Sequence, residues 1–225
     1  MTQTWRDLLF AHWLVSAAAL RPLVPRGLEL DLFAGEAWVG VVPFRIAPLA
    51  LRGGPRRAGL AFPELNVRTY VVAEGKPGVW FFSLDAASVL AVVIARLTYH
   101  LPYYWARMRL DNDAGAVAYA SRRRHPGAPT AEFAGRYWPT GPVFASTPGS
   151  LEHWLTARYC LYAANRAGRL FRGEINHLPW PLQPAEAVIE ANTMAAAHGI
   201  ALAGQPLLHF ARRIDMVAWW PERVG

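Results

Sequence analysis

Runs of apolar and β-branched residues, separated by turn-forming residues, predict that much of this chain is sheet. The segment 37–46 is rich in valine, tryptophan and phenylalanine and stops before Pro48, which is typical of a buried strand. Two pairs of such segments flank the turn sequences Glu74-Gly75-Lys76-Pro77-Gly78 and Asp111-Asn112-Asp113-Ala114-Gly115, so two β-hairpins are expected. The expected strands are Ala37–Ile46, Leu65–Ala73, Val79–Leu84, Tyr103–Leu110, Ala116–Arg123, Ala131–Tyr137, Leu170–Ile175 and Leu207–Trp219.

Apolar residues at helical spacing predict helices between these strands. Leucine, valine and isoleucine between positions 90 and 97 repeat every three or four residues, and the helix they predict must end before Pro102. Ser16 is well placed to cap a short helix near the N-terminus. The expected helices are Ala17–Leu23, a helix from about Ala86 to just before Pro102, Pro148–Asn165 with Gly168 as its stop, and Ala185–His198.

This succession of elements indicates an α+β fold, a mostly antiparallel sheet that curls around a core or a pocket. Residues 50–63 include Gly53-Gly54-Pro55-Arg56-Arg57, the strongest cluster of structure-breaking residues, and predict a mobile flap beside whatever the fold encloses. The chain has no Gly-x-Gly-x-x-Gly after a strand, no phosphate-loop Gly-Lys-Ser and no serine nucleophile elbow. A nucleotide-binding α/β fold is therefore not expected.

The composition favours one folded domain over residues 1–225. With 53% hydrophobic and 17% charged residues, the chain is not intrinsically disordered. Its longest nearly unbroken apolar stretch, 86–95, is about half of the roughly 20 residues that a membrane-spanning helix needs. The apolar segment 8–20 is interrupted by His12 and Ser16, so we expect it to be structural and not a cleaved signal. Cys160 is the only cysteine and cannot form an internal disulfide, which makes a cytoplasmic location the expectation.

The charge is strongly positive and is carried by arginine. The formal net charge is +7, and Lys76 is the only lysine among 23 basic residues, which leaves 22 arginines. One explanation is the codon usage of a GC-rich genome; the other is anion recognition, because guanidinium groups bind carboxylate or phosphate through paired hydrogen bonds. The dense runs Arg56-Arg57 and Arg122-Arg123-Arg124 fall at expected turns or strand ends, so nucleic acid is not an expected partner.

Two of the expected strands place polar side chains on one face, and these are candidate site residues. Because side chains alternate along a strand, Glu64, Asn66 and Arg68 share a face. That face either lies in water or lines an enclosed pocket, where Glu64 would exchange protons and Arg68 would hold an anion. The second such strand places on one face Tyr103, Trp105, Arg107 and Arg109. The alternation alone does not tell which face points inward.

The histidines and the cysteine add one further candidate segment. No two of the seven histidines have the spacing that would place a metal ligand pair on one helix face, so we expect neither a metal nor a cofactor. His177 opens the sequence His177-Leu178-Pro179-Trp180-Pro181-Leu182, which suits a rigid loop with Trp180 as an aromatic anchor. His177 is either a packed structural histidine or part of the site. Cys160 is expected in the middle of a helix, as a core residue and not a nucleophile.

Several long blocks of this sequence resemble the YqjF-like family of unknown function. They are Gly27–Asp31, Ala37–Phe44, Glu64–Tyr70, Gly75–Asp85, Leu101–Tyr104, Leu155–Tyr159 and His177–Leu182, and they run through nearly the whole chain. That family is placed in the acetoacetate decarboxylase-like superfamily. The resemblance implies a curved antiparallel sheet that closes into a cone-shaped β-barrel, with a central pocket and a few peripheral helices.

The resemblance also implies which residues line the pocket. The decarboxylases carry an arginine six residues before a proline, followed by two lysines, the first of which forms a Schiff base with the keto acid. Here Arg96 stands six residues before Pro102, but Tyr103 and Tyr104 follow. A Schiff base needs a desolvated amine, and the only lysine lies in a turn that we expect to be exposed, so decarboxylation through an imine is not expected. Glu64 and Arg96 resemble the pocket glutamate and the arginine of the superfamily.

Three functions stay open at this point. A lysine-independent enzyme acting on a small carboxylate or keto compound would use Glu64 as general base, Tyr103 or Tyr104 as proton donor, and Arg96 or Arg68 to hold a carboxylate or enolate. A binding protein would hold a small anionic or amphipathic ligand without turnover. The third is a structural or interaction protein. The candidate ligand-binding residues are Asn66, Arg68, Arg96, His100, Arg107, His177 and Trp180.

The expected partner is an anionic small molecule, in a pocket of several hundred cubic ångströms. We expect no membrane association. A homo-oligomer is compatible with the ten tryptophans and with the superfamily, whose members often form oligomers.

Overall fold

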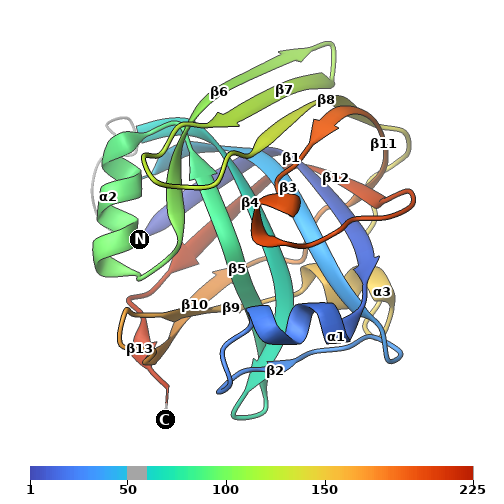
Figure 1. Cartoon of the computed structure of the whole chain (residues 1–225). Coiled ribbons are helices and arrows are strands. Elements are labelled where there is room, and N and C mark those ends of the chain that lie inside the picture. Colours follow the sequence, from blue (N-terminus) through green and yellow to red (C-terminus); the bar gives the residue numbers. More distant parts are fainter. Residues whose placement is uncertain (50–59, 225) are drawn as a thin grey trace.

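The computed structural model describes residues 1–49 and 60–224, and within them thirteen strands pair into one sheet (Figure 1). The strands are β1 Thr2–Val15, β2 Glu29–Leu30, β3 Ala37–Leu49, β4 Leu60–Ala73, β5 Lys76–Ala86, β6 Tyr103–Asp113, β7 Ala116–Arg123, β8 Glu132–Pro139, β9 Cys160–Ala164, β10 Leu170–His177, β11 Gln183–Asn192, β12 Leu207–Ala218 and β13 Glu222–Arg223. The helices are α1 Ala17–Leu20, α2 Val89–Thr98 and α3 Leu151–Thr156, with 3-10 turns at Arg21–Leu23 and Ala196–His198. The prediction of a mostly antiparallel sheet with few helices is confirmed.

The strand pairings return on themselves. One closed path runs β5–β9–β10–β12–β1–β3–β4 and back to β5. A second path, β6–β7–β8–β11, connects β5 to β12 and packs over the outer face of β1, β3 and β4. The three central strands are therefore covered on both faces (Figure 1).

Alternate residues of the central strands serve two different cores. Leu9, Val41 and Val67 pack outward with Tyr119 and Phe133 of the second path. Their neighbours in sequence, such as Phe10 and Val42, point inward, where they pack with Trp180 and with α2. The inward set leaves the internal cavity described below.

The predicted hairpins and the helix before Pro102 are confirmed, with longer strands than expected. The strands β4 and β5 pair from Glu64 opposite Ala86 to Ala73 opposite Lys76. Helix α2 begins after Ser88, whose side-chain oxygen accepts a hydrogen bond from the main-chain N–H of Ala91. No described helix combines the length and the apolar character needed to cross a membrane.

The helix predicted over Pro148–Asn165 is wrong beyond its first turns. Helix α3 ends at Thr156, and Ala157 leaves helical geometry with a ψ of 65°. Cys160 then opens strand β9, which pairs with β10 on one side and with β5 on the other. The apolar spacing of this segment suits a helix and a strand alike, and pairing on both edges decides in favour of the strand.

The helix predicted over Ala185–His198 is also wrong. Residues Gln183–Asn192 form β11, which pairs with β8, and its side chains alternate between half-buried and exposed. Only Ala196–His198 is helical, as one 3-10 turn that ends at Gly199 in the left-handed conformation, with φ 74°. Alanine favours helices in isolation, but the ladder with β8 overrides that preference.

Two further expectations from the sequence concern the N-terminal segment and the glycine-rich segment. Residues 2–15 form β1, a strand that the sequence did not predict, and Ala17–Leu23 forms the expected short helical segment as α1 and a 3-10 turn. Most of the loop expected over 50–63 falls at 50–59, outside the described residues. Residues 60–63 are not loop but the start of β4.

Candidate functional site

A cavity of about 160 Å³ lies inside the closed path of strands. Strand β4 contributes Glu64, Asn66 and Arg68, which are 3%, 6% and 9% exposed, so their shared face lines the cavity and does not lie in water. Other polar lining residues come from distant parts of the chain and include Tyr103, Thr156, Arg158, His177 and Trp180. Apolar side chains from α2 and from the strands of the closed path form most of the remaining wall.

Glu64 and Tyr103 form a hydrogen-bonded pair at the cavity wall. The Tyr103 hydroxyl donates to Glu64 Oε2 at 2.9 Å, and the Tyr119 hydroxyl donates to the main-chain oxygen of Glu64 at 2.8 Å. Burial raises the pKa of Glu64 to about 8, and the bond from Tyr103 offsets only part of that rise. Burial and the neighbouring Glu64 raise the pKa of Tyr103 well above its usual value. At neutral pH the carboxyl group is therefore mostly protonated and close to its titration point.

Arg68 brings a positive charge into the cavity that no described carboxylate pairs with. Its guanidinium donates from Nη2 to the main-chain oxygen of Leu155 at 3.4 Å, and none of the ion pairs among residues 1–49 and 60–224 includes it. Its central carbon lies 5.5 Å from the centre of the Phe10 ring and 5.8 Å from that of Tyr70. The pKa of His177 is lowered, first by burial and also by the charge of Arg68. A buried guanidinium without a carboxylate partner among the described residues is a group that pairs readily with an anion.

Six of the residues predicted from the sequence meet in this cavity, and the structure places four others elsewhere. The six are Glu64, Asn66, Arg68, Tyr103, His177 and Trp180. Tyr104, Arg96 and His100 line an open groove of about 880 Å³ on the outside, and Arg107 is exposed on β6.

Local geometry explains why three of these residues, Tyr104, Arg96 and His100, miss the cavity. Tyr104 follows Tyr103 on the same strand and so points to the opposite face, where its ring packs on the Arg123 guanidinium at 4.3 Å. Arg96 lies on the outer side of α2, and its Nη1 donates to the main-chain oxygen of Tyr103 at 2.7 Å. Arg96 thus braces the strand that carries Tyr103 without reaching the cavity. His100 turns outward with a φ of 55° and packs on Phe171.

Arg158 is a cavity residue that the sequence did not predict. The sequence predicted a helix over 148–165, in which Arg158 would be an ordinary helix residue. Helix α3 instead ends at Thr156, and the chain beyond it places the Arg158 side chain at the cavity. Its Nη1 forms an ion pair with Asp31, and its Nε donates to the main-chain oxygen of Trp154 at 2.7 Å. The one available signal was its place in the block Leu155–Tyr159, which carries the resemblance.

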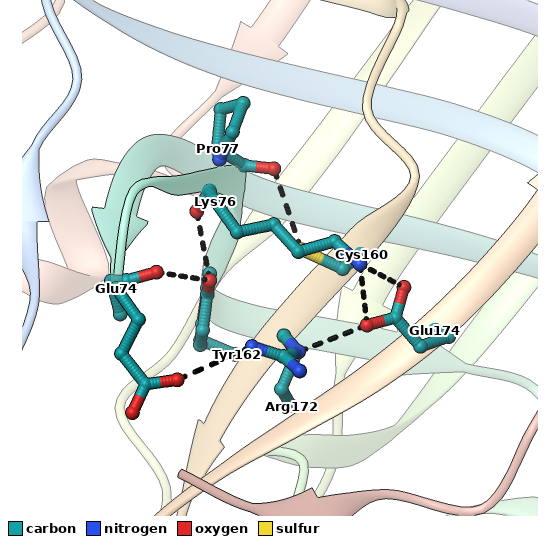
Figure 2. A network of polar contacts seen from close by, with 8 residues as sticks. Glu74, Lys76, Pro77, Cys160, Tyr162, Arg172 and Glu174 are labelled. Carbon is teal, nitrogen blue, oxygen red and sulfur yellow. Dashed lines mark hydrogen bonds and ion pairs between the residues drawn. The ribbon is translucent and has the colours of Figure 1, made fainter. Parts of the chain in front are cut away.

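The only lysine belongs to a different part of the molecule. Lys76 Nζ binds both carboxylate oxygens of Glu174 at 2.7 Å, and Arg172 binds the same carboxylate at 2.9 Å (Figure 2). Lys76 does not line the cavity. Cys160 lies in the same cluster, where its thiol contacts the main-chain oxygen of Pro77 and burial raises its pKa (Figure 2). The cluster ties the β4–β5 turn to β9 and β10 and offers no free amine or reactive thiol.

In the described residues no three His, Cys, Asp or Glu side chains gather as metal ligands.

The family of the chain follows from comparison with known sequences. The model of the DUF2071 family, described as an uncharacterized conserved protein, matches residues 2–215. The uncharacterized protein YqjF of Bacillus subtilis (strain 168) is 48% identical over 225 residues, which cover 99% of this chain and 91% of YqjF. The chain belongs to the DUF2071 family. The resemblance stated from the sequence blocks is thereby confirmed.

Solved structures show which fold this DUF2071 protein has. An acetoacetate decarboxylase from Legionella pneumophila superimposes with a TM-score of 0.69 at 11% identity, covering 100% of this chain and 87% of its own. The enduracididine biosynthesis enzyme MppR, in complex with pyruvate, gives 0.69 at 12% identity and covers 100% and 90%. An acetoacetate decarboxylase-like enzyme from Sphingomonas wittichii RW1 gives 0.68 at 14% identity and covers 100% and 92%. At these identities the similarity establishes the acetoacetate decarboxylase-like fold of the DUF2071 protein and nothing further.

Proposed function

We propose that this protein is a lysine-independent enzyme that moves a proton at the carbon next to the carbonyl of a small carboxylate or keto acid. In this proposal, the closed path of strands forms the cone-shaped β-barrel expected from the sequence, and the substrate binds in its cavity. The observation that carries the proposal is the Glu64–Tyr103 pair, 2.9 Å apart, in the wall of a cavity that also contains an unpaired arginine.

The geometry supports the following division of labour. Arg68 neutralises the substrate carboxylate, which positions the carbonyl group and the C–H carbon on its other side in the cavity. Glu64, in its ionised form, takes a proton from that C–H carbon: the C–H bond breaks, an O–H bond forms on Glu64, the electron pair of the C–H bond forms the C=C bond of an enolate, and the π pair of the carbonyl moves onto its oxygen. The Tyr103 hydroxyl is the neutral donor beside the developing enolate. Glu64 then returns the proton, and a pKa of about 8 suits both directions near neutral pH.

The cavity volume limits the substrate to a small molecule. An engineered protein cavity of about 150 Å³ holds benzene, which has six heavy atoms. The cavity here has a similar volume, about 160 Å³, which is smaller than the several hundred cubic ångströms expected from the sequence. Pyruvate, a keto acid with six heavy atoms, matches this size, and it is the molecule bound in the structurally similar MppR.

The route through an imine does not fit the cavity. A Schiff base would need a lysine amine at the substrate carbonyl. Lys76, the only lysine of the chain, is instead paired with Glu174 at 2.7 Å, outside the cavity. We therefore assign proton transfer to Glu64 and not to a lysine-bound intermediate.

The test is hydrogen–deuterium exchange at the methyl group of pyruvate in D₂O, followed by proton NMR. The wild-type protein should accelerate exchange above the buffer rate, Glu64→Gln should reduce the enzymatic rate by about 100-fold or more, and Tyr103→Phe by about tenfold. Lys76→Ala is the control and should leave the exchange rate unchanged.

Two outcomes would contradict this function. Loss of exchange in Lys76→Ala, with Glu64→Gln still active, would restore a lysine mechanism. Binding of pyruvate by the wild-type protein without any accelerated exchange would show a binding protein, the alternative that the sequence left open.

A further inference from the structure

Four residues that line the cavity each have a buried polar atom without a hydrogen-bond partner among the described residues. Three are donors: Arg68 Nε, Arg158 Nη2 and Trp180 Nε1. The fourth is an acceptor, Asn66 Oδ1. All four residues are at least nine-tenths buried. They come from β4, from the turn after α3 and from the loop after β10, and a buried polar group without a partner is costly. Their convergence on one cavity indicates a ligand that supplies the missing partners.

Arg158 is held in one orientation that leaves one terminal NH2 group, Nη2, for this ligand. Its Nη1 binds Asp31 and its Nε binds the main-chain oxygen of Trp154. The guanidinium also packs 4.4 Å from the centre of the Trp154 ring and 4.9 Å from that of Tyr70. Nη2 is the remaining arm and has no protein partner in the described chain.

Arg68 reaches the same region from the opposite element. Its central carbon lies 5.8 Å from the centre of the Tyr70 ring, so both guanidinium groups lie within 6 Å of that ring. Leu155, whose main-chain oxygen accepts from Arg68 and from the Tyr70 hydroxyl, stands only three residues before Arg158. Both guanidinium groups belong to residues that line the cavity, and an anion bound by both would offset their positive charges.

The charges of the cavity side chains determine which ligand charge fits. Arg68 and Arg158 contribute two positive charges, Asp31 contributes one negative charge through its ion pair, and Glu64 is mostly neutral at pH 7. Among these side chains one positive charge remains, so a ligand with one carboxylate neutralises the Arg68 and Arg158 end of the cavity. A dicarboxylate would leave a buried negative charge in excess.

The position of Asn66 sets a second feature of the ligand. Asn66 lies between Glu64 and Arg68 on the same face of β4. Its unsatisfied oxygen can accept a hydrogen bond from a hydroxyl group placed next to the carboxylate, as in a 2-hydroxy acid or in the enol form of a 2-oxo acid.

We propose that Arg158 and Arg68 together bind the single carboxylate of the ligand, that Asn66 accepts a hydrogen bond from its adjacent hydroxyl or enol group, and that the cavity therefore selects small 2-hydroxy monocarboxylates and the enol form of 2-oxo monocarboxylates. This rests on the proposed function only in placing the ligand in the same cavity. It makes Arg158 a specificity-determining residue, although it lies outside the Glu64–Tyr103 pair.

The experiment is isothermal titration calorimetry with five probes of similar size: lactate, pyruvate, propionate, malonate and lactamide. Lactate or pyruvate should bind at least about tenfold more tightly than malonate, which has two charges, and lactamide, which has none. Propionate, which lacks the group for Asn66, should bind more weakly than lactate. Tightest binding by malonate or lactamide, or no binding by any probe, would overturn the proposal.

Variants of Arg158 assign the effect to that residue. Arg158→Gln should weaken lactate and pyruvate binding at least about tenfold. Arg158→Lys keeps the charge and the partner for Asp31, so it guards against misfolding, and it should also weaken binding because an ammonium group lacks the planar fork. The matched control is Arg45→Gln, since Arg45 is ion-paired with Asp7 at 3.0 Å outside the cavity, and it should bind like the wild type. Unchanged binding in both folded Arg158 variants would refute its role.

The outcomes separate this inference from the proposed function. Selective monocarboxylate binding that depends on Arg158, without accelerated exchange in D₂O, supports the inference and removes the enzymatic function. If the wild type accelerates exchange and the Arg158 variants have the same rate and the same KM, the enzymatic function is supported and the role of Arg158 in ligand binding is refuted.

Discussion

Glu64 keeps its proton in the folded protein at pH values where the unfolded chain has lost it. Its pKa is about 8 in the folded state against an ordinary value of 4.5, mainly because of burial. Between these values the folded state binds one proton more than the unfolded state, so its stability falls as the pH rises, by at most about 1.4 kcal/mol per pH unit. The contribution is fully present below pH 4.5 and is lost as the pH passes 8.

Glu64→Gln removes this titration and should flatten the dependence. We expect the free energy of unfolding of the wild type, relative to that of the variant, to fall from about pH 5 to about pH 8 and to level off above it. Urea denaturation of both proteins across this range measures the difference. Parallel curves would mean that Glu64 is ionised in the folded protein throughout.

At the scale of single residues, the sequence located six residues of the site and missed Arg158. Alternation along β4 grouped Glu64, Asn66 and Arg68, and a period of two is a property of any strand. Whether that face points inward depends on what packs over it, which the pattern does not contain. Arg158 was missed because its orientation depends on where α3 ends, and that end is set by the pairing of β9 with its two neighbours.

At the scale of elements, β5 and β9 approach each other so closely that only glycine fits at position 78. A Cβ built on Gly78 would lie 2.7 Å from Cys160 Sγ and 2.9 Å from the main-chain oxygen of Cys160. Backbone cannot move aside cheaply, so Gly78→Ala should lower the free energy of unfolding by about 1–3 kcal/mol. Thermal or urea denaturation measures it.

Gly173→Ala, on the neighbouring β10, is the matched control. Its Cβ would meet the flexible side chain of Leu161 at 3.2 Å, and we expect a smaller loss of stability than for Gly78→Ala. Equal losses in the two variants would show that the close approach at Gly78 does not determine the spacing of β5 and β9.

A buried ion pair ties β5 to β7. Arg123 donates from Nε and Nη2 to the two carboxylate oxygens of Asp85, each at 2.7 Å, and the side chains are 1% and 0% exposed. Arg123→Met would leave the Asp85 carboxylate without its partner, so a loss of about 3–5 kcal/mol in unfolding free energy is expected. The double variant Asp85→Leu/Arg123→Met should be more stable than Arg123→Met alone. A double variant at least as unstable as the single one would refute this account.

The two mispredicted elements have a common cause. Both β9 and β11 have apolar or alanine-rich sequences that suit a helix locally, and both become strands through partners distant in sequence: β5 and β10 for the first, β8 and β12 for the second. The hairpin β4–β5 was predicted correctly because its turn and its pairing lie within one segment. The sequence therefore predicts local pairings, whereas long-range pairings emerge only in the assembled sheet.

At the scale of the whole molecule, the closed path of strands brings the cavity residues together from positions 1 to 218. Nothing in composition or periodicity contains this closure; the resemblance to the superfamily supplied it. The closed path also explains how a buried cation is tolerated. Arg68 is held between the Phe10 and Tyr70 rings and a main-chain oxygen. The free energy needed to bury its charge is therefore offset by the stability of the surrounding sheet.

That cost leads to a prediction for the stability of the whole protein. Arg68→Met replaces an unpaired buried charge by an apolar side chain, while the Leu155 oxygen keeps the Tyr70 hydroxyl as donor. We expect the ligand-free variant to be more stable than the wild type by about 1–2 kcal/mol. Arg158→Gln should act in the opposite direction, because it leaves Asp31 without its partner.

A carboxylate ligand should reverse the order. At a concentration of about 100 times its Kd, it stabilises the wild type by about 2.7 kcal/mol and has no such effect on a variant that cannot bind it. Urea denaturation of the wild type and Arg68→Met, each with and without pyruvate, gives the four values needed. If Arg68→Met is less stable than the wild type in the absence of ligand, the charge of Arg68 is already compensated in the folded protein. The case for an anion in this cavity would then have to rest on Arg158 alone.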